Sequence, residues 1–164
     1  MPRNHFAALC LTIALSAPLY ANAQEATYAL GRTDFSDTGR DGTVFQFEYR
    51  FQPFSIRRVA SFAWAASGAI TERGDAFVGA GIWTRWQWQS GWFIDMSTMP
   101  GFYRDGDDAN DLGSTFLFRS LVGVGYTFDN GNAISLAVTH KSNAGLASDN
   151  PGVNTYDIRF HHRF

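Results

Sequence analysis

Period-two alternation of apolar and polar residues recurs along this chain and limits it to folds built from β-strands. The clearest example lies between residues 43 and 52, where Phe45, Phe47, Tyr49 and Phe51 alternate with polar or charged residues. A strand with this pattern has one apolar face and one polar face. After residue 23 no uninterrupted apolar run approaches the roughly 20 residues that a membrane-spanning helix requires. The pattern therefore predicts an all-β protein and excludes a helical membrane protein.

The first 23 residues differ from the rest and are predicted to be a cleaved secretory signal. A short basic start is followed by an apolar stretch from Ala7 to Tyr20 and by Ala21-Asn22-Ala23, a small-x-small cleavage pattern. The exported domain is then residues 24–164. The single cysteine, Cys10, lies in the signal, so we expect no disulfide and no thiolate metal site in the exported domain.

Eight alternating segments follow the signal, and a closed up-and-down bacterial barrel requires an even number of strands. Three connections between them are short, and one of these contains the Asn130-Gly131 pair favoured in tight hairpins, whereas four are longer and more polar. Short turns at one rim and long loops at the other are typical of outer-membrane barrels. We therefore predict an eight-stranded antiparallel up-and-down transmembrane β-barrel. The expected strands are residues 25–34, 43–52, 56–70, 76–88, 92–103, 115–128, 133–143 and 154–164.

Two features favour a membrane barrel over a soluble lipid-binding calyx, which would turn its apolar face inward. Aromatic residues gather near strand ends and suit a girdle at the membrane interface, as in Trp83, Trp86, Trp88 and Trp92 around one tight turn. The last strand alternates up to a final Phe164, which resembles the C-terminal signature of barrels assembled into bacterial outer membranes. The calyx stays open as an alternative, because sequence alone does not say which face is inside.

The charge balance argues against nucleic-acid binding. The chain has 13 basic and 15 acidic residues and a formal net charge of −2, so no broad basic surface is available to follow a phosphate backbone. The acidic run from Asp105 to Asp111 lacks the glutamate that closes a calcium loop, and we interpret it as a solvated loop. We expect no metal and no cofactor; assembly into a homo-oligomer is an open alternative.

The candidate chemistry lies near the end of the chain, where His140 and Ser142 share one face of the expected strand 133–143. A histidine beside a serine is the minimum for nucleophilic catalysis, because the hydroxyl is inert until a base takes its proton. By itself the pair is weak evidence, since polar residues are ordinary at the rim of a barrel. A non-enzymatic barrel for adhesion or membrane stabilisation is therefore a second alternative.

The surrounding residues are more specific. They read His140-Lys141-Ser142-Asn143-Ala144-Gly145-Leu146, then Asn150-Pro151-Gly152-Val153-Asn154 and an aromatic terminal strand. Over residues 133–164 this resembles the lipid A 3-O-deacylase (PagL) family of outer-membrane enzymes. The resemblance implies an eight-stranded barrel in the bacterial outer membrane, with a serine hydrolase site on its membrane-facing surface. The implied reaction removes the ester-linked acyl chain at the 3-position of lipid A, so lipopolysaccharide is the implied substrate.

The resemblance also implies a role for each matching residue. Ser142 would be the nucleophile and His140 the general base. The side chain of Asn143, with backbone N–H groups around Ala144 and Gly145, would form the oxyanion hole.

The third member of the site departs from the family pattern. Family members with an acidic triad place a glutamate where this chain has Asn154, fourteen residues after the histidine. Alternation puts Asn154 on the same face of the last strand as Tyr156 and Ile158, whereas Asp157 lies on the opposite face. An asparagine can orient an imidazole but has no charge to stabilise imidazolium. We expect an active protein with a weaker electrostatic contribution.

Overall fold

Eight long strands make up most of the described protein. The computed structural model describes residues 23–35 and 39–164, so the predicted signal sequence lies outside this range except for Ala23. A very short strand, β3 (Ser55–Arg57), and a single 3-10 turn, η1 (Asp108–Asn110), complete the regular structure. The long strands are β1 (Ala23–Phe35), β2 (Thr43–Phe51), β4 (Ala60–Thr71), β5 (Ala76–Gln87), β6 (Trp92–Arg104), β7 (Phe116–Thr127), β8 (Ala133–Ser142) and β9 (Val153–Arg163).

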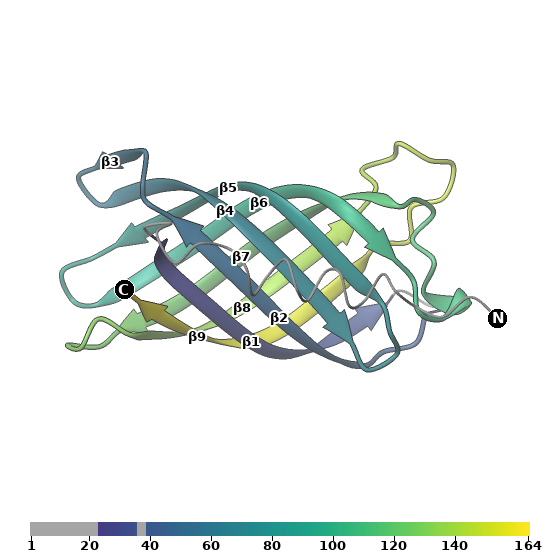
Figure 1. Ribbon diagram of the computed structural model, residues 1–164, viewed down its shortest axis with the longest axis horizontal. Helices are drawn as coiled ribbons and strands as arrows, with labels where there is room; N and C mark the ends of the chain where they lie inside the picture. Colours follow the sequence, from purple (N-terminus) through teal and green to yellow (C-terminus); the bar gives the residue numbers. More distant parts are fainter. Residues whose placement is uncertain (1–22, 36–38) are drawn as a thin grey trace.

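The strands form one closed antiparallel barrel. Each long strand pairs with the next long strand in the chain, β2 pairs with β4 across the β3 excursion, and β1 pairs with β9. Because the first and last strands are joined, the sheet has no open edge along its long strands, and the backbone hydrogen bonds are made between strands. The predicted eight-stranded up-and-down barrel is confirmed (Figure 1).

The connections that were expected to be short and those that were expected to be long lie at opposite rims. In Figure 1 the C-terminus, the β5–β6 turn and the β7–β8 turn lie at one end, and the loop carrying η1 and the β8–β9 loop lie at the other. None of the described residues forms a helix long and apolar enough to cross a membrane.

One strand was predicted incorrectly. The expected strand 56–70 is interrupted at Arg58 and Val59, because β3 folds back to pair with the start of β4 in a small hairpin, with Arg57 opposite Ala60. Arg58 has a φ of 39°, a left-handed conformation that reverses the chain. The connection after β2 is therefore longer than the tight turn expected from Gln52-Pro53-Phe54-Ser55.

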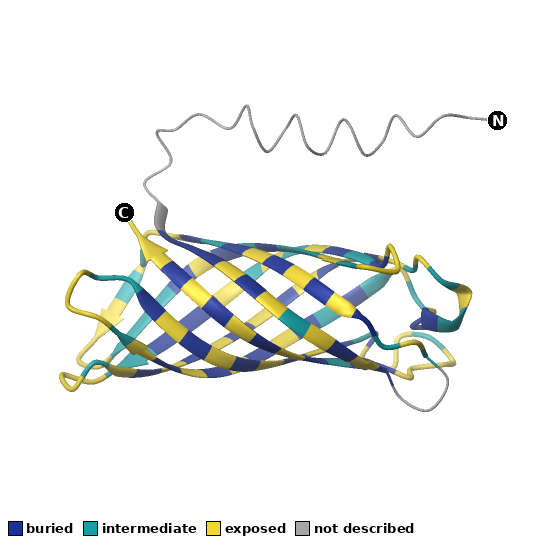
Figure 2. Ribbon diagram, turned by 90° about the horizontal axis from the view of Figure 1, so that it is seen from below, coloured by how far each residue is buried: buried dark blue, intermediate teal, exposed yellow. Residues whose placement is uncertain are grey.

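The wall is apolar outside and polar inside. Along most strands buried residues alternate with exposed or partly exposed ones, and Figure 2 displays this as bands of dark blue, yellow and teal along the ribbons. In β5 the alternation is interrupted where Trp83, Thr84 and Arg85 are all buried. The exposed set is dominated by large apolar residues such as Leu30, Ile158 and Leu136, whereas the interior holds many charged and hydroxyl side chains. This polarity is the reverse of that of a soluble protein and fits a barrel solvated by lipid. It rules out the soluble calyx, whose apolar face would point inward.

Ion pairs connect many of the buried interior charges. Near one end Glu25 accepts from Arg50 at 2.6 Å and from Arg85 at 3.0 Å, and Arg85 also donates to Asp95 at 2.7 Å. Farther along, Glu48 lies 3.2 Å from the guanidinium groups of both Arg119 and Arg159. Buried charges are costly unless they are paired and hydrogen bonded, so these networks allow charged side chains to fill part of the interior, beside the apolar clusters that contain Leu117 and Met99.

The tryptophan cluster is only in part the girdle that the sequence suggested. Trp88 and Trp92 are exposed on the outer wall, but Trp83 is buried in the barrel with the Arg50 guanidinium 3.2 Å from its ring centroid. The reason is strand parity, because Trp83 falls on the inward-facing positions of β5. It supplies a cation–π contact in place of an interfacial anchor.

Because the outer wall is apolar, a charged residue placed on it is expected to lower the stability of the barrel. Leu136 is outward in β8 and 61% exposed, and Leu146 in the β8–β9 loop is 67% exposed. We expect Leu136→Arg to lower the free energy of unfolding by about 2–4 kcal/mol in lipid vesicles, because the guanidinium must enter hydrocarbon. Leu146→Arg is the matched control and should cost less than about 1 kcal/mol, since it stays in water. Urea titrations in vesicles measure both; equal costs would contradict the proposed orientation of the wall.

Candidate active site

The three residues of the predicted site share the outer wall at the long-loop end of the barrel. His140 and Ser142 lie on the outward face of β8, and Asn154 lies outward near the start of β9. The β8–β9 register places His140 directly opposite Asn154. Between the first two, Lys141 points into the interior, as alternation requires. The fold therefore brings His140 and Asn154 together although fourteen residues separate them in the chain.

A hydrogen bond fixes the histidine ring. Nδ1 of His140 lies 2.9 Å from Oδ1 of Asn154. An amide oxygen can only accept, so Nδ1 carries the proton and donates it. In the neutral ring Nε2 is then the basic nitrogen. This is the tautomer that a general base needs when its second nitrogen is to take a proton from a serine.

Ser142 and His140 lie two residues apart on β8, with their side chains on the same outer face. Residues two apart on a strand are separated by about 6.6 Å along the chain and point the same way. The serine is partly exposed and the histidine is exposed, so both groups are reachable from outside the barrel. The contact that the structure records is the one between His140 and Asn154; pairing of Ser142 Oγ with His140 Nε2 stays a prediction.

Gly152 packs against the histidine ring from the β8–β9 loop. A Cβ at this position would lie 2.9 Å from Cε1 and 3.5 Å from Nε2 of His140, and the backbone has a φ of +71°. Glycine is required here for two reasons: the close approach to the ring, and the left-handed conformation. Gly152 belongs to the motif that resembles the family, but its sequence position predicted no role for it. The Pro151-Gly152 pair predicts a turn, but the sequence does not show that this turn contacts the ring of His140.

The side chain of Asn143 does not point toward a substrate, and its predicted role as an oxyanion donor is wrong. The residue is fully buried, and its amide nitrogen already donates to the carbonyl oxygens of Leu112 at 3.0 Å and Asp149 at 2.5 Å. Its Oδ1 accepts from the N–H of Gly145 at 2.9 Å. Position 143 follows Ser142 and falls on the inward side of the wall, so Asn143 organises the loop and makes no contact with the outer surface.

The residues after Asn143 form a tight turn with left-handed backbone. Leu146 N–H donates to the Asn143 carbonyl at 3.1 Å, and Ala144 and Gly145 between them have φ values of 55° and 77°. Two successive positive φ values define a type I′ turn. Alanine is uncommon in this conformation, and such strained positions cluster at functional sites. Because the Gly145 N–H is bonded to Asn143, the Ala144 N–H is the strongest remaining candidate of the predicted oxyanion donors.

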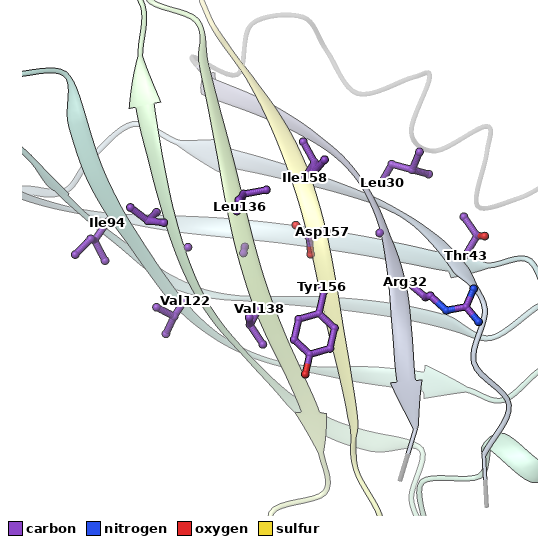
Figure 3. A pocket seen from close by; sticks show the side chains of 14 residues that line it. Leu30, Arg32, Thr43, Ile94, Val122, Leu136, Val138, Tyr156, Asp157 and Ile158 are labelled. Atoms are coloured by element: carbon purple, nitrogen blue, oxygen red, sulfur yellow. The ribbon is translucent and has the colours of Figure 1, made fainter. Parts of the chain in front are cut away.

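Apolar side chains surround the polar group on the outer wall. On the loop side Phe118 lies opposite Ser142, and Phe118, Phe116 and Phe102 make edge-to-face contacts at 5.4 Å and 5.9 Å between ring centroids. Below His140, toward the middle of the barrel, β1 and β6 to β9 contribute an apolar recess. Figure 3 shows its outward side chains, which include Leu30, Ile94, Val122, Leu136, Val138, Tyr156 and Ile158.

The other acidic residues considered near the site are not partners of His140. Asp157 is buried inside the barrel, where it accepts from Gln46 at 2.7 Å. Asp149 uses its backbone carbonyl to hold Asn143, and its side chain is exposed in the loop. Within residues 23–35 and 39–164, no cluster of three or more His, Cys, Asp or Glu side chains is arranged to hold a metal ion.

Fold and site together define a class: a small closed barrel that carries a serine and an oriented histidine on its outer wall. Residues 54–163 match the family model described as "Lipid A 3-O-deacylase (PagL)". This segment is more than half of the chain, and the chain belongs to that family.

Curated relatives and a solved structure agree with this assignment. The chain is 38% identical over 48 residues to the lipid A deacylase PagL of Pseudomonas aeruginosa, which covers 29% of this chain and 28% of that protein. It is 34% identical over 53 residues to the lipid A deacylase PagL of Bordetella bronchiseptica, covering 32% of this chain and 30% of that protein. The matched segments thus span less than a third of these relatives. A crystal structure of the outer membrane enzyme PagL superposes with a TM-score of 0.70 at 20% identity, over 85% of this chain and 99% of that one, which supports the fold.

The contact between Gly152 and His140 predicts a change of tautomer in Gly152→Ala. The added methyl group would displace the ring and break the bond to Asn154. We expect the proton of His140 to move from Nδ1 toward a mixture of both tautomers, measured by ¹⁵N NMR of the imidazole in detergent micelles. Gly131→Ala is the matched control, since Gly131 has a φ of +85° but no atom within 4 Å of the added Cβ. A His140 that keeps its Nδ1 proton in Gly152→Ala would contradict the contact.

Proposed function

We propose that this protein is an outer-membrane serine hydrolase that removes the ester-linked acyl chain at the 3-position of lipid A. The observation that carries the proposal is the bond from His140 Nδ1 to Asn154 Oδ1 on the exposed outer wall, two residues from Ser142. Membership in the lipid A 3-O-deacylase family supplies the reaction class. The curated relatives named lipid A deacylase, and the outer membrane enzyme of the same fold, support both the substrate and the location.

The proposed reaction uses His140 first as a base and then as an acid. Ser142 Oγ attacks the ester carbonyl carbon while Nε2 of His140 takes the hydroxyl proton. The tetrahedral intermediate collapses, the bond from carbon to the sugar oxygen breaks, and imidazolium returns the proton to that oxygen. A water molecule then attacks the acyl-serine ester with the same histidine as base. The products are a free fatty acid, a lipid A with one hydroxyl restored, and the original serine.

Charge on the intermediate's oxygen needs a donor close to Ser142. The N–H of Ala144 is our candidate, because it follows the nucleophile by two residues in the type I′ turn, at the strained φ of 55°. Asn143 acts indirectly: its three side-chain hydrogen bonds hold the turn in place. A preorganised donor of this kind contributes about 3–4 kcal/mol to lowering a barrier of this type.

The arrangement of the outer wall suits a lipid substrate. Lipid A places its sugars at the membrane surface and its acyl chains in the hydrocarbon, so a site turned toward lipid receives the ester without removing it from the bilayer. The apolar recess below His140 offers contact to an acyl chain, and the Phe102, Phe116 and Phe118 rings do so beside Ser142. No soluble substrate would require a nucleophile on the outside of such a barrel.

Removal of the nucleophile or the base tests the proposal. We expect Ser142→Ala and His140→Gln each to lower the rate of fatty-acid release from lipid A by about 10³-fold or more, since members of a triad act as one unit. Mass spectrometry of lipid A from cells producing each variant provides the measurement.

Ser148→Ala is the matched control for Ser142→Ala, because Ser148 is an exposed serine of the same loop and lies outside the proposed machinery. All variants should keep the heat-modifiable migration of a folded barrel on gels. Unchanged lipid A acylation with the folded wild-type protein would favour a non-enzymatic barrel and overturn the proposal.

A further inference from the structure

The base of the proposed site has a neutral partner. Asn154 orients His140 through Oδ1, but it brings no negative charge to the imidazolium that forms when Ser142 is deprotonated. His140 and Asn154 therefore lack a negatively charged third group. Because β1 pairs with β9 to close the barrel, a residue of β1 lies next to Asn154 on the side away from His140.

The residue of β1 next to Asn154 is Asp34. It lies on the outward face of β1, and the β1–β9 register puts it directly opposite Asn154. Asn154 in turn lies directly opposite His140 in the β8–β9 register. Asp34, Asn154 and His140 therefore form one row across three adjacent strands, on the same outer face. Side chains directly opposite in an antiparallel pair have Cβ atoms about 5 Å apart.

The orientation of the Asn154 amide allows Asp34 to act on His140 through it, an arrangement called the relay below. Because Asn154 directs Oδ1 toward His140, its Nδ2 with two N–H donors is on the other side of the planar amide. A carboxylate on the neighbouring strand can accept from that group. Such a contact would hold the amide in the orientation that fixes the histidine tautomer, and would place a negative charge behind it.

We propose that Asp34 is a positioning residue of this site, acting through Asn154 to hold the amide and to stabilise the imidazolium of His140. This inference rests on the proposed hydrolase function. The carboxylate that the family pattern places directly beside the histidine is, in this chain, one strand farther away. Asp34 does not touch substrate.

Among the described residues that face outward on β1, β7, β8 and β9, Asp34 is the acidic one near His140. Glu72, in the β4–β5 turn, is exposed and lies near Arg32. On the facing strands and loop the outward neighbours of His140 are Ser120, Asn154, Gly152 and, diagonally, Tyr156. Arg32 is the other outward charge of β1 near the site, and it lies opposite Tyr156, one row farther toward the middle of the barrel. Lys141 is close in sequence but faces the interior, and Asp149 is in the exposed loop.

Three variants test the role of Asp34: Asp34→Asn, Asn154→Glu and the double variant. We expect Asp34→Asn to lower kcat for fatty-acid release in lipid A micelles by about tenfold with little change in KM, because a charge two strands away is lost. Asn154→Glu places a carboxylate directly against His140 and should raise kcat above that of the wild type. In that background Asp34→Asn should have little effect, since the charge is already supplied.

The acid limb of the kcat profile gives a second readout. A nearby carboxylate favours imidazolium, so its removal in Asp34→Asn should move the acid limb of kcat to lower pH. Asp129→Asn is the matched control: it removes the same charge in the β7–β8 turn at the opposite rim and should change neither kcat nor the limb.

¹⁵N NMR of the His140 imidazole in a Ser142→Ala background separates this inference from the function itself. A smaller share of the Nδ1-protonated tautomer in Asp34→Asn supports the relay even if lipid A is not the substrate. An unchanged tautomer and an unchanged kcat would overturn it. A tenfold loss that is equally large in the Asn154→Glu background would also overturn it, because Asp34 would then act by another route.

Discussion

The pairing of β1 with β9 is the interaction on which the rest of the structure depends. It joins the two ends of the sheet, so the long strands expose no unpaired backbone edge to the surrounding medium. Closure also separates an inside from an outside, which allows the interior to hold charges such as Glu48 and Arg119 while the exterior is apolar. The same register aligns Asp34 with Asn154, so the contact that closes the barrel also completes the neighbourhood of the proposed base.

Because side chains alternate along a strand, neighbouring residues of the site point to opposite sides of the wall and have different roles. In the run from His140 to Asn143, the outward residues carry the proposed chemistry and the inward residues support it. Asn143 holds the β8–β9 loop from within by three side-chain hydrogen bonds, and the turn that it organises presents the N–H of Ala144 near the nucleophile. The loop also returns Gly152 to the edge of the imidazole, so one short segment fixes both sides of the reacting group.

Asn154 stands where the resemblance to the family places a glutamate, so the proposed site lacks one negative charge. Orientation and charge are separable duties of the third member of a triad. Asn154 retains the first, because its Oδ1 accepts the Nδ1 proton of His140. The second can be supplied from an adjacent strand, because neighbours across a sheet are nearly as close as neighbours along it. A barrel wall, with several strands facing the same lipid, offers more such positions than a loop does.

The period-two pattern was sufficient to predict the closed all-β fold, the eight long strands and the shared face of His140, Ser142 and Asn154, because side-chain direction in a strand depends on parity alone. It also contained the inward position of Asn143 and of Trp83, although functional resemblance and aromatic clustering suggested otherwise. Only the tertiary structure decided the β3 hairpin, the direction of the apolar face, the approach of Gly152 to His140 and the alignment of Asp34 with Asn154. These features depend on the register between strands and on which face closure turns inward, and neither is encoded within a single strand.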